Sequence, residues 1–308
     1  MVRKTYFVVN PHSAHGRTAK AWPEIKALAE KTLGPVTAGF TERMGHAADL
    51  ARAALQQGFN FIVSVGGDGT NNEVVNGFFE SGQAVNPEAA MGVVCSGTGS
   101  DLIRTLLIPR DFRAAIPLIP KWEPKPTDAG RLTFINHEGR ETVRLFINIT
   151  SAGVGGEVDD RVNKTTKIFG GKASFLWGSL RGALAYTNRR LAIRLDNGEP
   201  FERTVFNLAV SNGQFFGAGM RTAPKAEVDD GLFDVVVMGD FSFFEQLRLS
   251  RLIYSGAHLA MAKVESYRAK KVELTCPDRV LLDVDGEQPG MLPATMELLP
   301  AAIKIVRP

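Results

Sequence analysis

Short apolar runs alternate with amphipathic stretches through the first part of the chain. The apolar runs are rich in β-branched residues, which is typical of buried strands. The stretches that follow them repeat apolar residues at helical spacing. This pattern predicts strands at 5–9, 36–40, 60–65 and 91–95, and helices at 17–31, 43–57, 71–80 and 99–107. Strands that alternate with helices imply an α/β domain with a mainly parallel sheet, covered on both faces.

The pattern changes at 120–126, where three prolines in seven residues predict a linker. Strand-like segments dominate beyond it and indicate an antiparallel β-sandwich. The expected strands are 131–136, 142–150, 191–196, 204–211, 233–238, 271–276, 280–284 and 295–299, with inserted helices at 172–188 and 242–259. We therefore expect a first domain at 1–126 and a second at 127–299, and residues 300–308 could return to the first domain.

Composition indicates an ordinary globular protein with a weak positive charge. The 308 residues are 44% hydrophobic and 22% charged, and the net charge is +3. This charge is too small to predict nucleic acid as a partner, although a basic patch could face anionic lipid or ATP. Cys95 and Cys276 are expected as free thiols in a reducing compartment. No apolar run reaches the roughly 18–20 residues that span a bilayer and no signal peptide is evident, so we expect a cytoplasmic protein with peripheral membrane contact.

The strongest candidate site follows the predicted strand at 60–65. Its sequence is Gly66-Gly67-Asp68-Gly69-Thr70-Asn71-Asn72-Glu73. Glycines allow a tight turn and close approach to a ligand, and the free N–H groups of a helix start suit a phosphate. Asp68 fits such a site if a divalent cation or ordered water lies between it and the phosphates. The alternative is a plain strand-to-helix turn that Asp68 caps.

Three further loops fall just past predicted strand ends, where ligands bind in sheets of this kind. They begin at Asn10, Thr41 and Ser96. Together with the glycine loop they could build a single nucleotide site. In the last of these loops Ser100 or Asp101 could cap the following helix, a role that needs no ligand.

These motifs resemble the diacylglycerol kinase and sphingosine kinase family and, more loosely, NAD kinases and 6-phosphofructokinases. The resemblance lies in Gly66–Thr70 with Asn72-Glu73, the Asn-Pro turn at 10–17, the Thr41–Ala47 element, the Gly97-Thr98 loop, and the segments 148–158, 211–235 and 281–287. It covers nearly the whole chain. It implies a Rossmann-like N-terminal domain and a β-sandwich C-terminal domain. Ser100 and Gly156-Glu157 depart from the asparagine and Asp-Ala that are usual in the family.

The resemblance implies ATP-dependent phosphorylation of a lipid hydroxyl, with Mg²⁺ as cofactor. The nucleotide would contact Asn10, Thr41, Gly66, Gly67, Asp68, Gly69, Thr70, Asn71, Asn72, Gly97 and Thr98. Asp68 would orient Mg²⁺ and its waters, and Glu287 in Asp285-Gly286-Glu287 would accept the proton of the attacking hydroxyl. Because Asp68 and Glu287 belong to different predicted domains, folding has to bring them to opposite sides of one site.

The resemblance also implies a structural Mg²⁺ at the Asp230-Gly231 turn. Its ligands would be the Asp230 carboxylate and main-chain oxygens of Glu227 and Leu232, a reasonable set for a hard cation. A plain Asp-Gly turn is the alternative. The amphipathic segment 172–186 could lie on a membrane, or it could pack on the sandwich.

The acceptor stays open among several lipids, since diacylglycerol, a sphingoid base, a ceramide and phosphatidylglycerol all carry a hydroxyl on an apolar body. An NAD kinase would share the glycine loop, but the motifs at 230–231 and 285–287 favour a lipid kinase. A non-catalytic nucleotide- or lipid-binding module is the third possibility, which the departures at Ser100 and Gly156 allow. The sequence does not indicate an oligomeric state.

Overall fold

A parallel sheet forms the centre of the N-terminal domain in the computed structural model, which describes residues 3–96, 100–157 and 186–308. Its strands are β1 (Thr5–Val9), β2 (Thr37–Phe40), β3 (Phe61–Gly66) and β6 (Ala90–Cys95), in the order β6-β3-β1-β2. β3 and β6 are buried along their whole length, which explains their continuous apolar sequences. The carboxyl ends of all four strands reach the same edge of the sheet, so the loops that follow them are gathered there.

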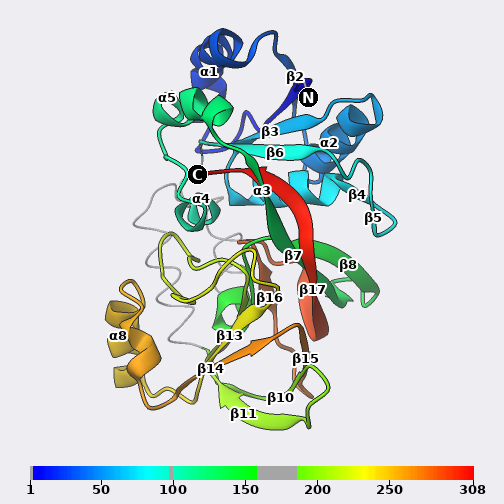
Figure 1. Ribbon diagram of the computed structural model, residues 1–308. Coiled ribbons are helices and arrows are strands. Elements are labelled where there is room, and N and C mark those ends of the chain that lie inside the picture. The colour runs from blue at the N-terminus through cyan, green and yellow to red at the C-terminus, as the bar shows by residue number, and fades with distance from the viewer. Residues whose placement is uncertain (1–2, 97–99, 158–185) are drawn as a thin grey trace.

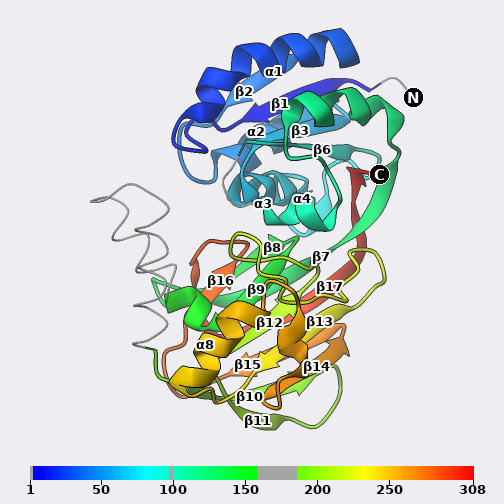
Figure 2. The ribbon, with the colours of Figure 1, turned by 90° about the vertical axis from the view of Figure 1, so that its left-hand side faces the viewer.

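Helices cover both faces of this sheet (Figure 2). One face carries α1 (Arg17–Leu33), α5 (Phe112–Ala115) and the 3₁₀ helix η1 (Ile116–Lys121), and the other carries α2 (His46–Gln56), α3 (Asp68–Gly77) and α4 (Asp101–Thr105). Side chains of successive β3 residues point to opposite faces of the sheet. Val63 belongs to the same buried cluster as Ile25 of α1, whereas Ile62 belongs to the cluster that contains Val74 of α3. A short hairpin, β4 (Phe79–Glu80) and β5 (Gln83–Ala84), follows α3.

The C-terminal domain is a sandwich of two antiparallel layers. One layer continues the first sheet through β7 (Pro124–Asn136), β8 (Glu141–Phe146), β10 (Arg189–Leu195), β11 (Phe201–Val205), β15 (Lys271–Thr275) and β17 (Gly290–Val306). The other contains β9 (Ile149–Gly153), β12 (Asn207–Ser211), β13 (Phe233–Met238), β14 (Val264–Ala269) and β16 (Leu282–Val284), in the order β14-β13-β12-β9-β16. Apolar side chains of both layers fill the space between them, and Phe146 stacks on Phe233 with ring centroids 5.4 Å apart.

Two long strands join the domains. β7, in green, and β17, in red, run side by side from the sandwich into the parallel sheet (Figure 1). Near its end β17 pairs with β6 in parallel, through Lys304 with Ala90 and Ile305 with Met91. The parallel sheet and one layer of the sandwich are therefore a single hydrogen-bonded structure.

The predicted fold class is confirmed: an α/β domain with a parallel sheet is followed by an antiparallel β-sandwich. Several predicted elements differ in detail. Part of the expected linker, from Pro124 onward, belongs to β7, where the prolines lie on a strand segment that β8 does not pair with. The predicted strand at 142–150 is two strands, β8 and β9, and β14 was not predicted. The predicted helix at 172–188 lies almost entirely outside the described residues.

The outer face of the second layer is covered by α8 (Phe243–Leu252) and the 3₁₀ helix η2 (Ala257–Ala260). Leu249 and Ile253 pack there against Val236 and Met238 of β13. The predicted helix at 242–259 is thus an α-helix and a separate 3₁₀ turn. Ser242 and Glu245 form a capping box that fixes the start of α8.

Candidate active site

The glycine loop lies at the junction of β3 and α3. None of Gly66, Gly67 and Gly69 has a positive φ, so these positions do not need glycine for a left-handed turn. At Gly66 glycine instead leaves space: a Cβ there would lie 2.4 Å from Thr70 Oγ1. The helix begins at Asp68, and no side chain caps its N-terminus. Its first N–H groups are therefore suited to bind an anion.

The acidic turn Asp285-Gly286-Glu287 is a tight hairpin loop after β16. Val284 and Glu287 exchange backbone hydrogen bonds of 2.7 and 3.0 Å, and Asp285 and Gly286 have φ values of 50° and 87°. Positive φ at both central positions is the geometry of a type I′ turn, which Asp-Gly favours. The buried Asp285 carboxylate accepts hydrogen bonds from Ile147 N, Asn148 N and Ile149 N, at 2.9, 3.0 and 2.9 Å.

The two motifs meet across the domain boundary. Oε1 of Glu287 lies 2.9 Å from the point that a Cβ of residue 69 would occupy. A Cβ at residue 69 would require the carboxylate to shift from this place. The structure therefore places the predicted base, Glu287, beside the predicted phosphate loop. The contact is at Gly69, which directly follows Asp68 in the chain.

Arg144 of β8 reinforces this junction. Its Nη2 lies 2.6 Å from Glu287 Oε2, and Nε and Nη2 donate to Asn72 Oδ1 at 2.9 and 2.6 Å. Sequence reasoning did not identify Arg144 as a site residue. The available signal was an arginine on the predicted strand 142–150, close before the Asn148 motif.

Two carboxylates stand close together at the start of α4. Asp68 accepts hydrogen bonds from Asp101 N at 3.0 Å and Leu102 N at 3.3 Å, so Asp68, rather than Ser100 or Asp101, caps this helix. Asp101 instead accepts from Ala218 N of the other domain at 2.7 Å. Burial raises the pKa of Asp68 above its usual value. Burial and then the neighbouring charge of Asp68 raise the pKa of Asp101 to about 6.

Of the other residues predicted to contact the nucleotide, some lie at the carboxyl edge of the sheet and others have side chains that point into the protein. Asn10 and Thr41 follow β1 and β2 at the carboxyl edge of the sheet, and Asn10 Nδ2 donates to Thr70 Oγ1 at 3.0 Å. Asn71 and Asn72 point inward: Asn71 Oδ1 accepts from Ser64 Oγ at 2.7 Å, and Asn72 is fully buried. Gly97 and Thr98 lie outside the described residues.

At the predicted structural metal site, Asp230 already has two partners. Its carboxylate forms an ion pair with Arg268 and accepts a hydrogen bond from Leu232 N at 3.0 Å. Glu227 is exposed nearby in the chain. In the part of the chain that is described, no three His, Cys, Asp or Glu side chains cluster as a metal site would require.

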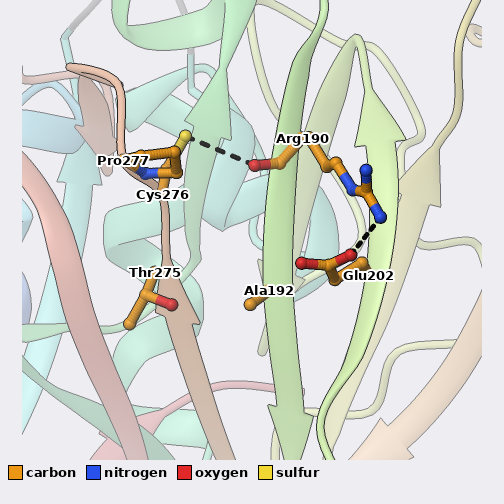
Figure 3. Close-up of a pocket in the computed structure, with 6 residues that line it drawn as sticks. All are labelled: Arg190, Ala192, Glu202, Thr275, Cys276 and Pro277. Carbon is orange, nitrogen blue, oxygen red and sulfur yellow. Dashed lines mark hydrogen bonds and ion pairs between the residues drawn. The ribbon is translucent and has the colours of Figure 1, made fainter.

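A surface hollow of about 530 Å³ lies elsewhere, on β10, β11 and the end of β15. Figure 3 shows that its side chains satisfy one another: Arg190 forms an ion pair with Glu202, and Cys276 Sγ donates to the Arg190 carbonyl oxygen at 3.4 Å. None of the predicted site residues lines this hollow. We assign it no part in the candidate site.

Fold and site together define a two-domain protein of NAD kinase-like architecture, with a glycine loop on one domain and an acidic turn on the other. Residues 4–132 match the family model of the diacylglycerol kinase catalytic domain. Residues 148–307 match the model of the YegS C-terminal NAD kinase beta sandwich-like domain. Because the second match covers more than half of the chain, the chain belongs to the family that carries this C-terminal domain, and the first match agrees with the resemblance that the motifs indicated.

Similar proteins agree with this assignment over the whole length. The diacylglycerol kinase of Staphylococcus carnosus is 28% identical over 311 residues, with 100% of this chain and 96% of the relative aligned. A putative diacylglycerol kinase from Bacillus anthracis has a TM-score of 0.78 at 22% identity, covering 99% of this chain and 95% of that one. An NAD kinase from Archaeoglobus fulgidus in complex with ATP has a TM-score of 0.52 at 14% identity, covering 98% and 92%. At these identities the two structures show a shared fold.

Among the helices of the described ranges, none has the length and apolar character that crossing a membrane requires.

Proposed function

We propose that this protein transfers the γ-phosphoryl group of ATP to a lipid hydroxyl, with diacylglycerol or a related lipid as acceptor and Mg²⁺ as cofactor. The observation that carries the proposal is the approach of Glu287 to Gly69, with 2.9 Å between Oε1 and the Cβ position of residue 69. It joins a candidate base on one domain to a phosphate-suited loop on the other. Family membership and the relatives named diacylglycerol kinase support the same activity.

The nucleotide would lie at the carboxyl edge of the parallel sheet. The uncapped start of α3 offers N–H groups to its phosphates through residues 66–70. Asn10, Thr41, Gly97 and Thr98 would complete the contacts. Asn71 and Asn72 would support nucleotide binding indirectly, because their buried hydrogen bonds hold the glycine loop in place.

Mg²⁺ would be held beside Asp68 and Asp101. Both carboxylates supply the oxygen ligands that Mg²⁺ prefers. The buried Oδ1 of Asp101 accepts no hydrogen bond from the described residues and has only the more distant Arg104 Nε, at 3.6 Å, as an ion-pair partner. When bound, the cation neutralises charge on the transferred phosphoryl group. At the second proposed site, the Asp230 carboxylate with main-chain oxygens of Glu227 and Leu232, the fit is poor, because Arg268 and the Leu232 N–H already bind the two carboxylate oxygens.

In the chemical step, the lipid hydroxyl oxygen attacks the γ-phosphorus in line with the bond to ADP, and that bond breaks as the new P–O bond forms. The hydroxyl proton passes to Oε1 of Glu287. A general base of this kind contributes typically ~10²–10⁴-fold to the rate. The remaining acceleration comes from positioning and from charge stabilisation at the loop.

A lipid acceptor requires contact with a membrane, at the cytoplasmic face where ATP is available. The predicted segment 172–186 lies outside the described residues except for its last residue, Tyr186. Among those described, α8 supports the proposal: Phe243, Phe244 and Leu247 are 54%, 79% and 45% exposed. Arg248 and Arg251 are exposed on the same helix and suit anionic head groups.

Radiolabelled ATP and a panel of acceptors test the proposal. Diacylglycerol, a sphingoid base, ceramide and phosphatidylglycerol would each be presented in mixed micelles, with NAD as the soluble comparison. We expect label in the organic phase with at least one lipid and none in NADP. Label transferred only to NAD, or to no acceptor while ATP binds, would overturn the proposal in favour of an NAD kinase or a binding module.

A further inference from the structure

Arg144 connects three parts of the site. It lies on β8 of the C-terminal domain, and its guanidinium reaches both α3 of the N-terminal domain and the acidic turn. Nη2 donates to Glu287 Oε2 at 2.6 Å, and both Nε and Nη2 donate to Asn72 Oδ1. The side chains of Arg144 and Glu287 are only 20% and 26% exposed. This ion pair is therefore screened less by solvent than a pair on the open surface.

The partner that anchors Arg144 is itself fixed. Asn72 Nδ2 donates to Asp285 Oδ2 at 2.7 Å and to the Leu145 carbonyl oxygen at 2.9 Å. Asp285 is held in turn by three backbone N–H groups at the start of β9. The guanidinium is thus oriented by a buried hydrogen-bond network before it contacts Glu287.

The two oxygens of Glu287 have different surroundings. Oε2 is occupied by Arg144, whereas Oε1 faces Gly69 and accepts no hydrogen bond within the described ranges. A carboxylate can take up a substrate proton only through an oxygen that the substrate can reach. Since Arg144 binds Oε2, the orientation of the Glu287 carboxylate leaves Oε1 as the oxygen that can accept the substrate proton.

We propose that Arg144 is a positioning residue for phosphoryl transfer, which turns Oε1 of Glu287 toward the glycine loop by holding Oε2. The inference rests on the proposed function. It assigns Arg144 an effect on kcat rather than on KM, because the residue acts on the orientation of the base. Lysine would keep the charge but would lose the planar fork that contacts Asn72 and Glu287 together.

A double-mutant cycle tests this role. Arg144→Ala should lower kcat ~10–100-fold, with KM for ATP and lipid changed less than ~3-fold, since small misplacements of catalytic groups have effects of this size. In a Glu287→Gln background, Arg144→Ala should lower the remaining kcat by less than ~3-fold, because residues that act through one another are non-additive. Equal effects in both backgrounds would show that Arg144 acts on the substrate directly and would overturn the inference.

Two further measurements separate positioning from loss of stability. Guanidinium at low millimolar concentration should restore part of the kcat of Arg144→Ala, and Arg144→Lys should recover little. Arg131 and Glu297 provide a matched pair, with the same 2.6 Å Nη2–Oε2 distance on β7 and β17 but no contact with the acidic turn. Arg131→Ala should leave kcat within ~2-fold, because exposed ion pairs contribute little.

A crystal structure of Arg144→Ala gives a readout that does not depend on activity. We expect the Glu287 carboxylate to leave its place beside Gly69. A carboxylate that stays there contradicts the inference even if the protein is a lipid kinase. If the carboxylate moves but the wild-type protein phosphorylates no lipid, the proposed function fails and the positional role of Arg144 stands.

Discussion

Asp285 shows how much of the site depends on a single buried side chain. Its carboxylate occupies the N–H groups of Ile147, Asn148 and Ile149, which a continuous strand would have used in its ladder. These bonds lie where the chain passes from β8 in one layer to β9 in the other. The same carboxylate fixes Asn72, and through it Arg144, so the position of Glu287 depends on a residue that does no chemistry.

Asp101 gives the protein a specific pH dependence. Its pKa of about 6 in the folded state exceeds the ordinary value of 3.8, so the folded protein holds this proton more tightly than the unfolded chain. Stability from this group is therefore present at low pH and is lost as the pH rises through about 6. In urea unfolding with EDTA, wild type should lose about 1–2 kcal/mol relative to Asp101→Asn between pH 5 and pH 7.5.

The control for this experiment is Asp111→Asn, at an aspartate whose side chain is 59% exposed. The difference between this variant and wild type should not change over the same pH range. A wild-type protein that gains stability relative to Asp101→Asn as pH rises would contradict the assignment.

Single residues were predictable from the sequence where a local motif carries them. Gly69 and Glu287 were both expected at the site, and the structure places them together. The glycines were expected to allow a sharp turn and close approach to a ligand; none of them has a positive φ, and a Cβ at Gly66 would lie too close to Thr70. Arg144 was not identified, because its role depends on two partners that lie 72 and 143 residues away in the chain and its position on a predicted strand was the only local signal.

At the scale of elements, α3 docks on the edge of β8 through paired amides. Asn76 Oδ1 accepts from Leu145 N and its Nδ2 donates to Leu145 O, at 2.9 and 3.0 Å, and Asn72 lies one helical turn before it. These bonds satisfy the strand edge and fix the start of α3 relative to the acidic turn. The helix therefore both presents the glycine loop and connects the domains.

Element prediction succeeded where the hydrophobic period was clear and failed where tertiary contacts decide. β1, β3 and β6 follow from continuous apolar runs. β7 and β17 were predicted only in part, as 131–136 and 295–299, because Pro124 and Pro126 in β7 and Pro293 and Pro300 in β17 indicate breaks when only local sequence is considered. Their pairing along 12 residue pairs overrides that signal.

The exposed face of α8 makes a testable prediction about membrane binding. Phe244→Ser combined with Leu247→Ser removes two exposed apolar side chains, each worth about 1.5–3 kcal/mol when fully buried. We expect binding to anionic vesicles to weaken at least ~10-fold. Vesicle sedimentation with phosphatidylglycerol at constant salt concentration measures the change.

The control is Met44→Ser, which removes an apolar side chain that is 82% exposed on the other domain. Its vesicle binding should match wild type. Unchanged binding by the α8 double variant would exclude this helix as the membrane contact.

At the scale of the whole molecule, one continuous sheet joins the two domains that carry the halves of the site. β7 and β17 extend from the sandwich into the parallel sheet (Figure 1), and the acidic turn lies where the chain passes from β16 of the other layer to β17. The network from Asp285 through Asn72 and Arg144 adds a second connection at the site itself. The site is therefore formed only by tertiary structure, although the glycine loop and the acidic turn could each be recognised as a motif in the sequence.

The most direct test of the account is the turnover number of Glu287→Gln with saturating ATP and lipid. The substitution keeps the size of the side chain but removes the proton acceptor, so kcat should fall ~10²–10⁴-fold while ATP binding and the unfolding midpoint stay near wild type. Glu297→Gln, at the end of the matched ion pair, should retain full activity. A Glu287→Gln variant that turns over lipid at close to the wild-type rate would contradict the central claim.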